Sequence, residues 1–137
     1  MSAAGLPSSR ALLASFDLVE RETRQLASIP ADSGLLGHLV GTAFGWRMRP
    51  ERALVAGDDA HSRLSRAGYH LEAGDLSRAV SELEAIGGLP ARGGTRLQQW
   101  LVGARSRLAV QQATDLVRAH LRLVAASQAN IVAAKHL

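Results

Sequence analysis

Two acidic side chains and a histidine, Asp58, Asp59 and His61, stand close together in the sequence, with His70 and Asp75 within reach. Carboxylate and imidazole groups bind divalent metals, so a metal site is one interpretation of this cluster. Against it, no two histidines have the i, i+4 spacing of a helical metal motif, and aspartate at these positions has a ready use as a helix N-cap. We therefore interpret the aspartates as caps and expect no metal site.

The sequence also lacks the common catalytic motifs. It contains no G-x-S-x-G nucleophile turn, no G-x-x-x-x-G-K phosphate loop and no dinucleotide fingerprint. There is no cysteine, which excludes a disulfide framework and a thiolate metal site. We predict a protein that is not an enzyme and that uses no cofactor.

Charge is unevenly placed along the 137 residues. Residues 57–91 hold three basic and six acidic side chains, a net charge of −3, whereas residues 92–137 hold seven basic and one acidic, a net charge of +6. The two parts are expected to pack together, or the basic part meets an anionic surface. Because the basic residues are widely spaced and no aromatic platform accompanies them, we expect no nucleic-acid partner.

Apolar periodicity predicts helix along most of the chain. Ser9 can cap a first helix that ends before Pro30, and Asp58 or Asp59 can cap a helix from Ala60 to Leu71. Gly74 then fits a helix C-terminus and Asp75 the next N-cap, which together predict a helical hairpin.

A long helix is predicted from Thr95 to about Ala126, because only Gly103 interrupts the pattern there. Its first apolar stripe is expected to face the core, with Trp100 as an anchor. A second, shifted stripe is a candidate dimer seam, formed by Val110, Ala113, Val117, Leu121 and Val124. The predicted fold class is all-α, a helical hairpin plus a long C-terminal helix, assembled as a dimeric helical bundle.

The stretch from Gly34 to Trp46 contains no formally charged side chain. As a helix it would rise only about 20 Å, too short for a hydrocarbon core of about 30 Å. On a helical wheel one arc is apolar and the opposite arc is lined with glycine. The arc is either core, or it enters a lipid surface with Arg47, Arg49 and Arg52 at the depth of the phosphates.

Further downstream, residues 64–88 and 100–113 resemble the signature of the mitofilin family. The matching residues are Tyr69, Leu71, Glu72, Gly74, Asp75, Leu76, Ala79, Leu83, Gly87, Trp100, Leu101, Ala104, Arg105, Leu108 and Gln112. The similarity covers about residues 60–125. Gly-Asp-Leu followed by alanine also occurs in tetratricopeptide-like hairpins, and the Trp-Leu and Ala-Arg pairs raise the match above that generic one.

The resemblance implies a membrane-shaping scaffold of the MICOS complex at crista junctions. It implies a domain on the intermembrane-space side of the mitochondrial inner membrane, or on the periplasmic side of a bacterial inner membrane. The implied partners are anionic membrane lipids, a CHCH-domain MICOS subunit and further copies of the chain in a homodimer or higher oligomer. A tetratricopeptide-like adaptor that binds peptides is the alternative function.

We accordingly divide the chain into an N-terminal helix in residues 1–30, an amphipathic lipid-binding segment and loop in residues 31–56, and a signature domain in residues 57–137. The predicted lipid-binding residues are Leu35, Leu36, Leu39, Val40, Phe44, Trp46, Arg47 and Arg49. The predicted residues for partner binding and self-association are Tyr69, Leu71, Leu76, Trp100, Leu101, Arg105, Leu108, Val117 and Leu121.

Overall fold

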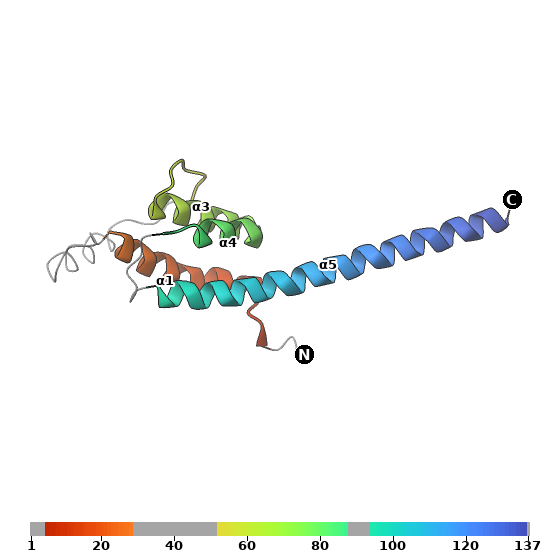
Figure 1. Ribbon diagram of the computed structural model, residues 1–137, viewed down its shortest axis with the longest axis horizontal. Helices are drawn as coiled ribbons and strands as arrows, with labels where there is room; N and C mark the ends of the chain where they lie inside the picture. The colour runs from red at the N-terminus through yellow and green to blue at the C-terminus, as the bar shows by residue number, and fades with distance from the viewer. Residues whose placement is uncertain (1–4, 29–51, 88–93, 137) are drawn as a thin grey trace. The chain divides into compact units, whose positions relative to one another are not determined.

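The computed structural model describes residues 5–28, 52–87 and 94–136 (Figure 1). These residues form the helices α1 (Ser9–Ala27), α3 (Ala60–Glu72), α4 (Leu76–Glu84) and α5 (Thr95–Lys135). No strand occurs among the described residues. The predicted all-α class, with a hairpin followed by a long C-terminal helix, is confirmed.

Helix α1 begins one residue earlier than the sequence suggested. The hydroxyl of Ser8, not Ser9, accepts a hydrogen bond from the backbone N–H of Ala11 at 3.1 Å and so caps the helix. Apolar side chains at intervals of three and four residues, Leu12, Phe16 and Val19, are buried. The amphipathic pattern of α1 therefore gives one core-facing side, as expected.

The α3–α4 hairpin is confirmed together with its caps. The carboxylate of Asp59 accepts from the backbone N–H of Ser62, and that of Asp75 accepts from the backbone N–H of Arg78, each at 3.0 Å. Gly74 between the helices has a φ of +80°, a left-handed conformation that favours glycine. The predicted turn chemistry is thus present at each expected position.

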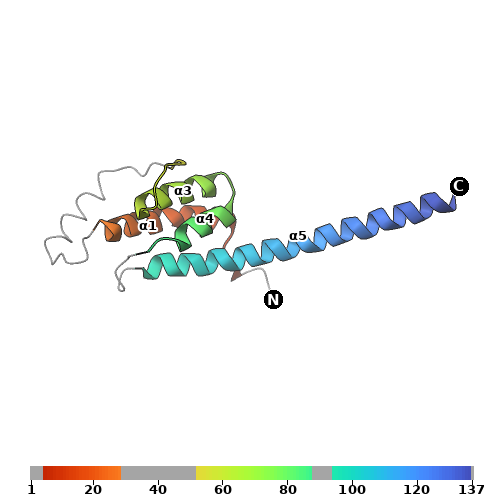
Figure 2. The same ribbon diagram turned by 45° about the horizontal axis from the view of Figure 1, so that its top comes forward.

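The core of residues 1–107 lies among α1, the hairpin and the first part of α5. Helices α3 and α4 lie side by side, and α3 also contacts α1 (Figures 1 and 2). Trp100 on α5 is buried against Phe16, with ring centroids 5.6 Å apart, and its indole N–H donates to the carbonyl oxygen of Leu12 at 3.0 Å. Trp100 is therefore the core anchor that the sequence predicted.

The chain divides into two compact units, residues 1–107 and 108–137, and α5 contributes to both. The helix continues to Lys135, past its predicted end near Ala126. The prediction was too short because it followed the apolar stripe, whereas no glycine or proline follows to stop the helix. None of the helices in the described segments is long and apolar enough to cross a membrane.

Candidate functional site

The uncharged stretch from Gly34 to Trp46, here called the apolar run, lies outside the described residues. This holds for each predicted lipid-binding residue, namely Leu35, Leu36, Leu39, Val40, Phe44, Trp46, Arg47 and Arg49. What the structure does describe is the chain on either side of the run, up to Ser28 at the end of α1 and from Arg52 onwards.

Arg52 is the first described residue after the run, and carboxylates of two helices bind its side chain. Its guanidinium donates to Glu72 of α3 at 2.7 Å, to Glu20 of α1 at 3.4 Å and to Asp17 of α1. It also lies over the ring of Phe16, 5.7 Å from the ring centroid, in a cation–π contact. The guanidinium of Arg52 is therefore engaged by the helices of its own chain, and its place at phosphate depth stays a prediction.

The position of the Arg52 side chain depends on a glycine that leaves room for it and on a buried carboxylate that pairs with it. A Cβ added to Gly68 on α3 would lie only 2.8 Å from Cγ of Arg52, so the arginine stem occupies the space that any larger residue would fill. Glu20 is fully buried and also accepts a hydrogen bond from Arg24, at 2.9 Å. The buried charge is thus compensated by two arginines, as a buried carboxylate requires.

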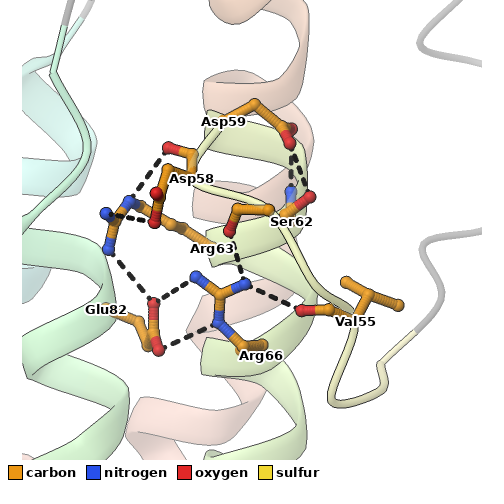
Figure 3. Close-up of polar contacts among 8 residues, drawn as sticks. Val55, Asp58, Asp59, Ser62, Arg63, Arg66 and Glu82 are labelled. Carbon is orange, nitrogen blue, oxygen red and sulfur yellow. Dashed lines mark hydrogen bonds and ion pairs between the residues drawn. The ribbon is translucent and has the colours of Figure 1, made fainter.

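A second arginine holds the loop that leads from Arg52 to α3. Arg66 donates to the carbonyl oxygens of Val55 and Gly57 at 2.8 and 2.7 Å, and to both carboxylate oxygens of Glu82 on α4 at 2.9 Å (Figure 3). The hydrogen bond from Arg66 lowers the pKa of the Glu82 carboxyl, which stays ionised in this bidentate pair. Residues 52–59 are thereby fixed to the helical core at both ends.

The aspartate and histidine cluster has structural partners. Asp59 caps α3, and Asp58 pairs with Arg63 at 3.0 Å (Figure 3). The hydroxyl and the backbone N–H of Ser62 lower the pKa of the Asp59 carboxyl to about 2. His61 lies 3.4 Å from the hydroxyl of Ser28. In the described part of the chain no group of three acidic, histidine or cysteine side chains is arranged to hold a metal ion, and the cap interpretation of Asp59 is confirmed.

The predicted partner residues fall into two sets. Tyr69, Val117 and Leu121 are exposed, Leu108 is half-buried, and Arg105 lies at the surface, where it pairs with Glu84 at 2.7 Å. The other set is part of the core of residues 1–107 and consists of Leu71, Leu76, Trp100 and Leu101. A direct contact with a partner is therefore available to the first set, whereas the second set supports the helices that carry it.

Exposed apolar side chains occur all along the second unit. Every described residue from Ala109 to His136 is exposed, and the large apolar side chains among them are 42% to 72% exposed. They are Val110, Leu116, Val117, Leu121, Leu123, Val124, Ile131 and Val132. So many exposed apolar side chains on one helix are typical of an interaction surface.

Comparison with known families shows which family the chain belongs to. The model of the family Mitofilin, described as "Mitochondrial inner membrane protein", matches residues 2–122. The chain belongs to the Mitofilin family. The resemblance expected from the hairpin and the Trp-Leu and Ala-Arg pairs is thereby confirmed, and the matched residues also include α1 and the apolar run.

Relatives of this chain are named as subunits of a protein complex. The chain is 35% identical over 119 residues to "MICOS complex subunit mic60" of Neurospora crassa and 34% identical over 119 residues to "MICOS complex subunit MIC60" of Sordaria macrospora. In both cases the alignment covers 87% of this chain and 17% of the relative, so the chain spans about a sixth of their length. No solved structure matches the chain.

The contacts of Arg52 and Arg66 in this mitofilin domain were not predicted from the sequence. The partners of Arg52 and Arg66 lie up to 35 residues away along the chain, beyond the reach of any local pattern. One local signal was present: a glycine inside a helical pattern, Gly68, often marks a close approach of another group. The exposed apolar side chains of the second unit were found only in part, because the predicted stripe stopped at Val124.

Proposed function

We propose that the chain is a non-enzymatic scaffold domain that organises membrane in a MICOS-type complex at crista junctions. The observation that carries the proposal is the family membership, together with relatives named as subunits of the MICOS complex. The described fold supports it, since its polar clusters have structural roles as caps and ion pairs. The domain acts at the mitochondrial inner membrane on the intermembrane-space side, and for a bacterial member the corresponding side is periplasmic.

In this proposal residues 31–56 supply the membrane contact. The apolar arc of the run, with Phe44 and Trp46, enters the lipid interface, and Arg47 and Arg49 meet anionic headgroups. Arg52 supports this assignment, because its side chain attaches the chain that follows the run to α1 and α3. A lipid-bound segment that is tied in this way holds the whole helical domain at the membrane surface.

Residues 57–137 supply the protein contacts. Tyr69 and Arg105 dock a CHCH-domain subunit, while Leu108, Val117 and Leu121 belong to the surface through which the chain self-associates. The exposure of these side chains supports the assignment. A peptide-binding tetratricopeptide-like adaptor has less support, because such arrays stack at least three hairpins and the described residues contain one, α3–α4.

Co-sedimentation with anionic liposomes tests the membrane contact. We expect the intact chain to pellet with vesicles containing phosphatidylserine or cardiolipin. Phe44→Asp and the double variant Arg47→Glu plus Arg49→Glu are expected to stay in the supernatant. Leu18→Asp is a matched control, because Leu18 is a 52% exposed apolar residue on α1, outside the proposed contact.

Far-UV circular dichroism of each variant separates lipid contact from folding. If the intact chain stays in the supernatant, the membrane proposal is wrong. If Phe44→Asp loses its helical signal while Leu18→Asp keeps it, the run is part of the core, and the proposed lipid contact is equally wrong.

A further inference from the structure

The last turn of α1 and the first turns of α3 meet at a polar cluster centred on Arg24. The side chain of Arg24 is only 16% exposed. One terminal nitrogen of its guanidinium, Nη2, donates to Glu20 on α1 at 2.9 Å and to Ser65 on α3 at 3.0 Å. The other terminal nitrogen, Nη1, lies 3.3 Å from Nδ1 of His61 on α3. Arg24 therefore binds α3 through two side chains, a hydroxyl and an imidazole.

The hydrogen bonds around His61 determine which form of the imidazole fits the cluster. Arginine can only donate, so Nδ1 of His61 accepts from Arg24 and carries no proton. The other ring nitrogen, Nε2, lies 3.4 Å from the hydroxyl of Ser28. That hydroxyl donates its single proton to the backbone carbonyl oxygen of Arg24 at 2.8 Å, so it accepts from Nε2–H. We assign the neutral imidazole with its proton on Nε2.

A second proton on His61 is incompatible with this arrangement. Both ring nitrogens of an imidazolium are donors, so Nδ1–H would point at an N–H group of Arg24, which stays charged at neutral and mildly acidic pH. The hydrogen bond is then lost, and two positive charges face each other across the 3.3 Å contact. Histidine exchanges its proton between about pH 5 and 8, so a mild fall in pH is enough to cause this change.

The carboxylate on the α1 side of the cluster does not offset the repulsion. Glu20 is fully buried and accepts from Arg24 at 2.9 Å, with Arg52 at 3.4 Å as a second cation. Its single negative charge already serves the guanidinium of Arg24. A positive charge on His61 beside that guanidinium therefore weakens the contact.

The carboxylates at the start of α3 also have partners. Asp58 pairs with Arg63 at 3.0 Å, and the carboxylate of Asp59 accepts from the hydroxyl of Ser62 at 2.6 Å. The backbone N–H groups of Ser62 and His61 stabilise the Asp59 carboxylate as well. Attraction of a charged His61 ring to Asp59 is the competing effect, and it would strengthen the start of α3 at low pH instead of weakening it.

We propose that the junction between α1 and α3 is a pH-sensitive contact, in which proton uptake by His61 releases the last turn of α1, at Arg24 and Ser28, from the first turns of α3. The contact stabilises the junction while the imidazole is neutral. Its contribution is lost as the pH falls and the ring takes up a proton. This regulation concerns the attachment of α1 and is independent of the proposed lipid and protein contacts.

Hydrogen–deuterium exchange of the intact chain and of His61→Asn tests the proposal. Asparagine places an amide oxygen near the position of Nδ1, so it still accepts from Arg24 but cannot take up a proton. At about pH 7.5 the imidazole is neutral, and we expect residues 20–28 and 60–66 to exchange equally fast in both proteins. At about pH 5.5 we expect these residues to exchange roughly fivefold faster in the intact chain, a factor that corresponds to the loss of one hydrogen bond. Comparing the two proteins at the same pH cancels the intrinsic pH dependence of exchange.

Two further variants complete the experiment. His120→Asn is the matched control, because His120 lies on the exposed part of α5, and its exchange should equal that of the intact chain at both pH values. Ser28→Ala removes the group that accepts from Nε2–H of His61. It should speed the exchange of residues 20–28 more at the higher pH than at the lower one, where the contact is already open.

The outcomes either support the proposal or overturn it. An equal ratio of exchange rates between the intact chain and His61→Asn at both pH values contradicts proton control. Slower exchange of the intact chain at the lower pH shows that Asp59 attracts the charged ring, which also overturns the proposal. If circular dichroism shows that His61→Asn does not fold, Ser28→Ala decides the question, and an effect of the same size at both pH values sinks the proposal.

Discussion

At the scale of single residues, two arginines that follow the apolar run, Arg52 and Arg66, have structural roles. Arg52 is only 19% exposed and bridges α1 and α3, and Arg66 joins the loop before α3 to α4. Asp59 had been identifiable from the sequence, because a cap acts on the N–H groups two and three residues ahead. The contacts of Arg52 and Arg66 could not be identified from the sequence, because their partners are distant along the chain and are brought close only by the tertiary packing.

A double-mutant cycle between Arg52 and Gly68 tests the close packing of the Arg52 side chain on α3. Alanine is favoured over glycine inside a helix by about 1 kcal/mol, so helix propensity by itself would make Gly68→Ala stabilise α3. In the native chain the new Cβ would displace the arginine stem, which lies 2.8 Å away. We therefore expect Gly68→Ala to raise the free energy of unfolding by about 1 kcal/mol in the Arg52→Ala background and by clearly less, or not at all, with Arg52 present.

Urea unfolding of the intact chain, the two single variants Gly68→Ala and Arg52→Ala, and the double variant measures the coupling free energy between the two positions. Arg52→Lys serves as a matched control, because it keeps a positive charge but loses the planar fork that reaches several carboxylates. An equal effect of Gly68→Ala in the presence and absence of Arg52 would contradict the close approach.

At the scale of elements, the helices that local signals define were predicted well, and the longest helix was predicted with the correct start but with an end that lies too early. The hairpin was predictable because Asp59, Gly74 and Asp75 each impose a boundary through backbone hydrogen bonds or a left-handed φ. At the C-terminal end of helix α5, no capping residue can be recognised from the sequence. Its extent follows instead from the lack of a helix breaker after Gly103, a weaker signal than a turn.

The cap of α3 should make stability depend on pH. The folded pKa of Asp59, about 2, lies below its ordinary value of 3.8, so the stabilisation is fully present above pH 3.8 and is lost as the pH falls through about 2. We expect Asp59→Ala to lower the free energy of unfolding by about 1 kcal/mol at pH 7 and by progressively less toward pH 2.

Denaturant unfolding of Asp59→Ala and of the intact chain between pH 2 and 7 measures this difference. Asp58→Ala is the neighbouring control, since Asp58 is almost fully exposed and makes only a surface ion pair with Arg63. A destabilisation by Asp59→Ala that stays constant over the whole pH range would show that the carboxylate charge has no part in the cap.

At the scale of the whole molecule, the account joins three surfaces of one chain. In the proposed function, the run before Arg52 meets lipid, the exposed part of the hairpin meets a protein partner, and the exposed apolar side chains of residues 109–136 meet another copy. Binding lipid, partner and copy through separate segments is what a scaffold requires, because occupying one surface leaves the others free. The fold class and the family could be predicted from the sequence, since caps, periodicity and the signature are local. The membrane contact stays a prediction, because the run lies outside the described residues.

The depth of Trp46 in a bilayer tests the central claim most directly. The chain has two tryptophans, Trp46 in the run and Trp100 in the core, where it is only 6% exposed. Tryptophan fluorescence is measured with anionic vesicles that contain phospholipids brominated in their acyl chains, which quench only side chains that enter the bilayer. The account predicts quenching of the intact chain and none of Trp46→Phe, whose remaining Trp100 is shielded by the core. Equal quenching of both proteins, or none of either at saturating lipid, would contradict it.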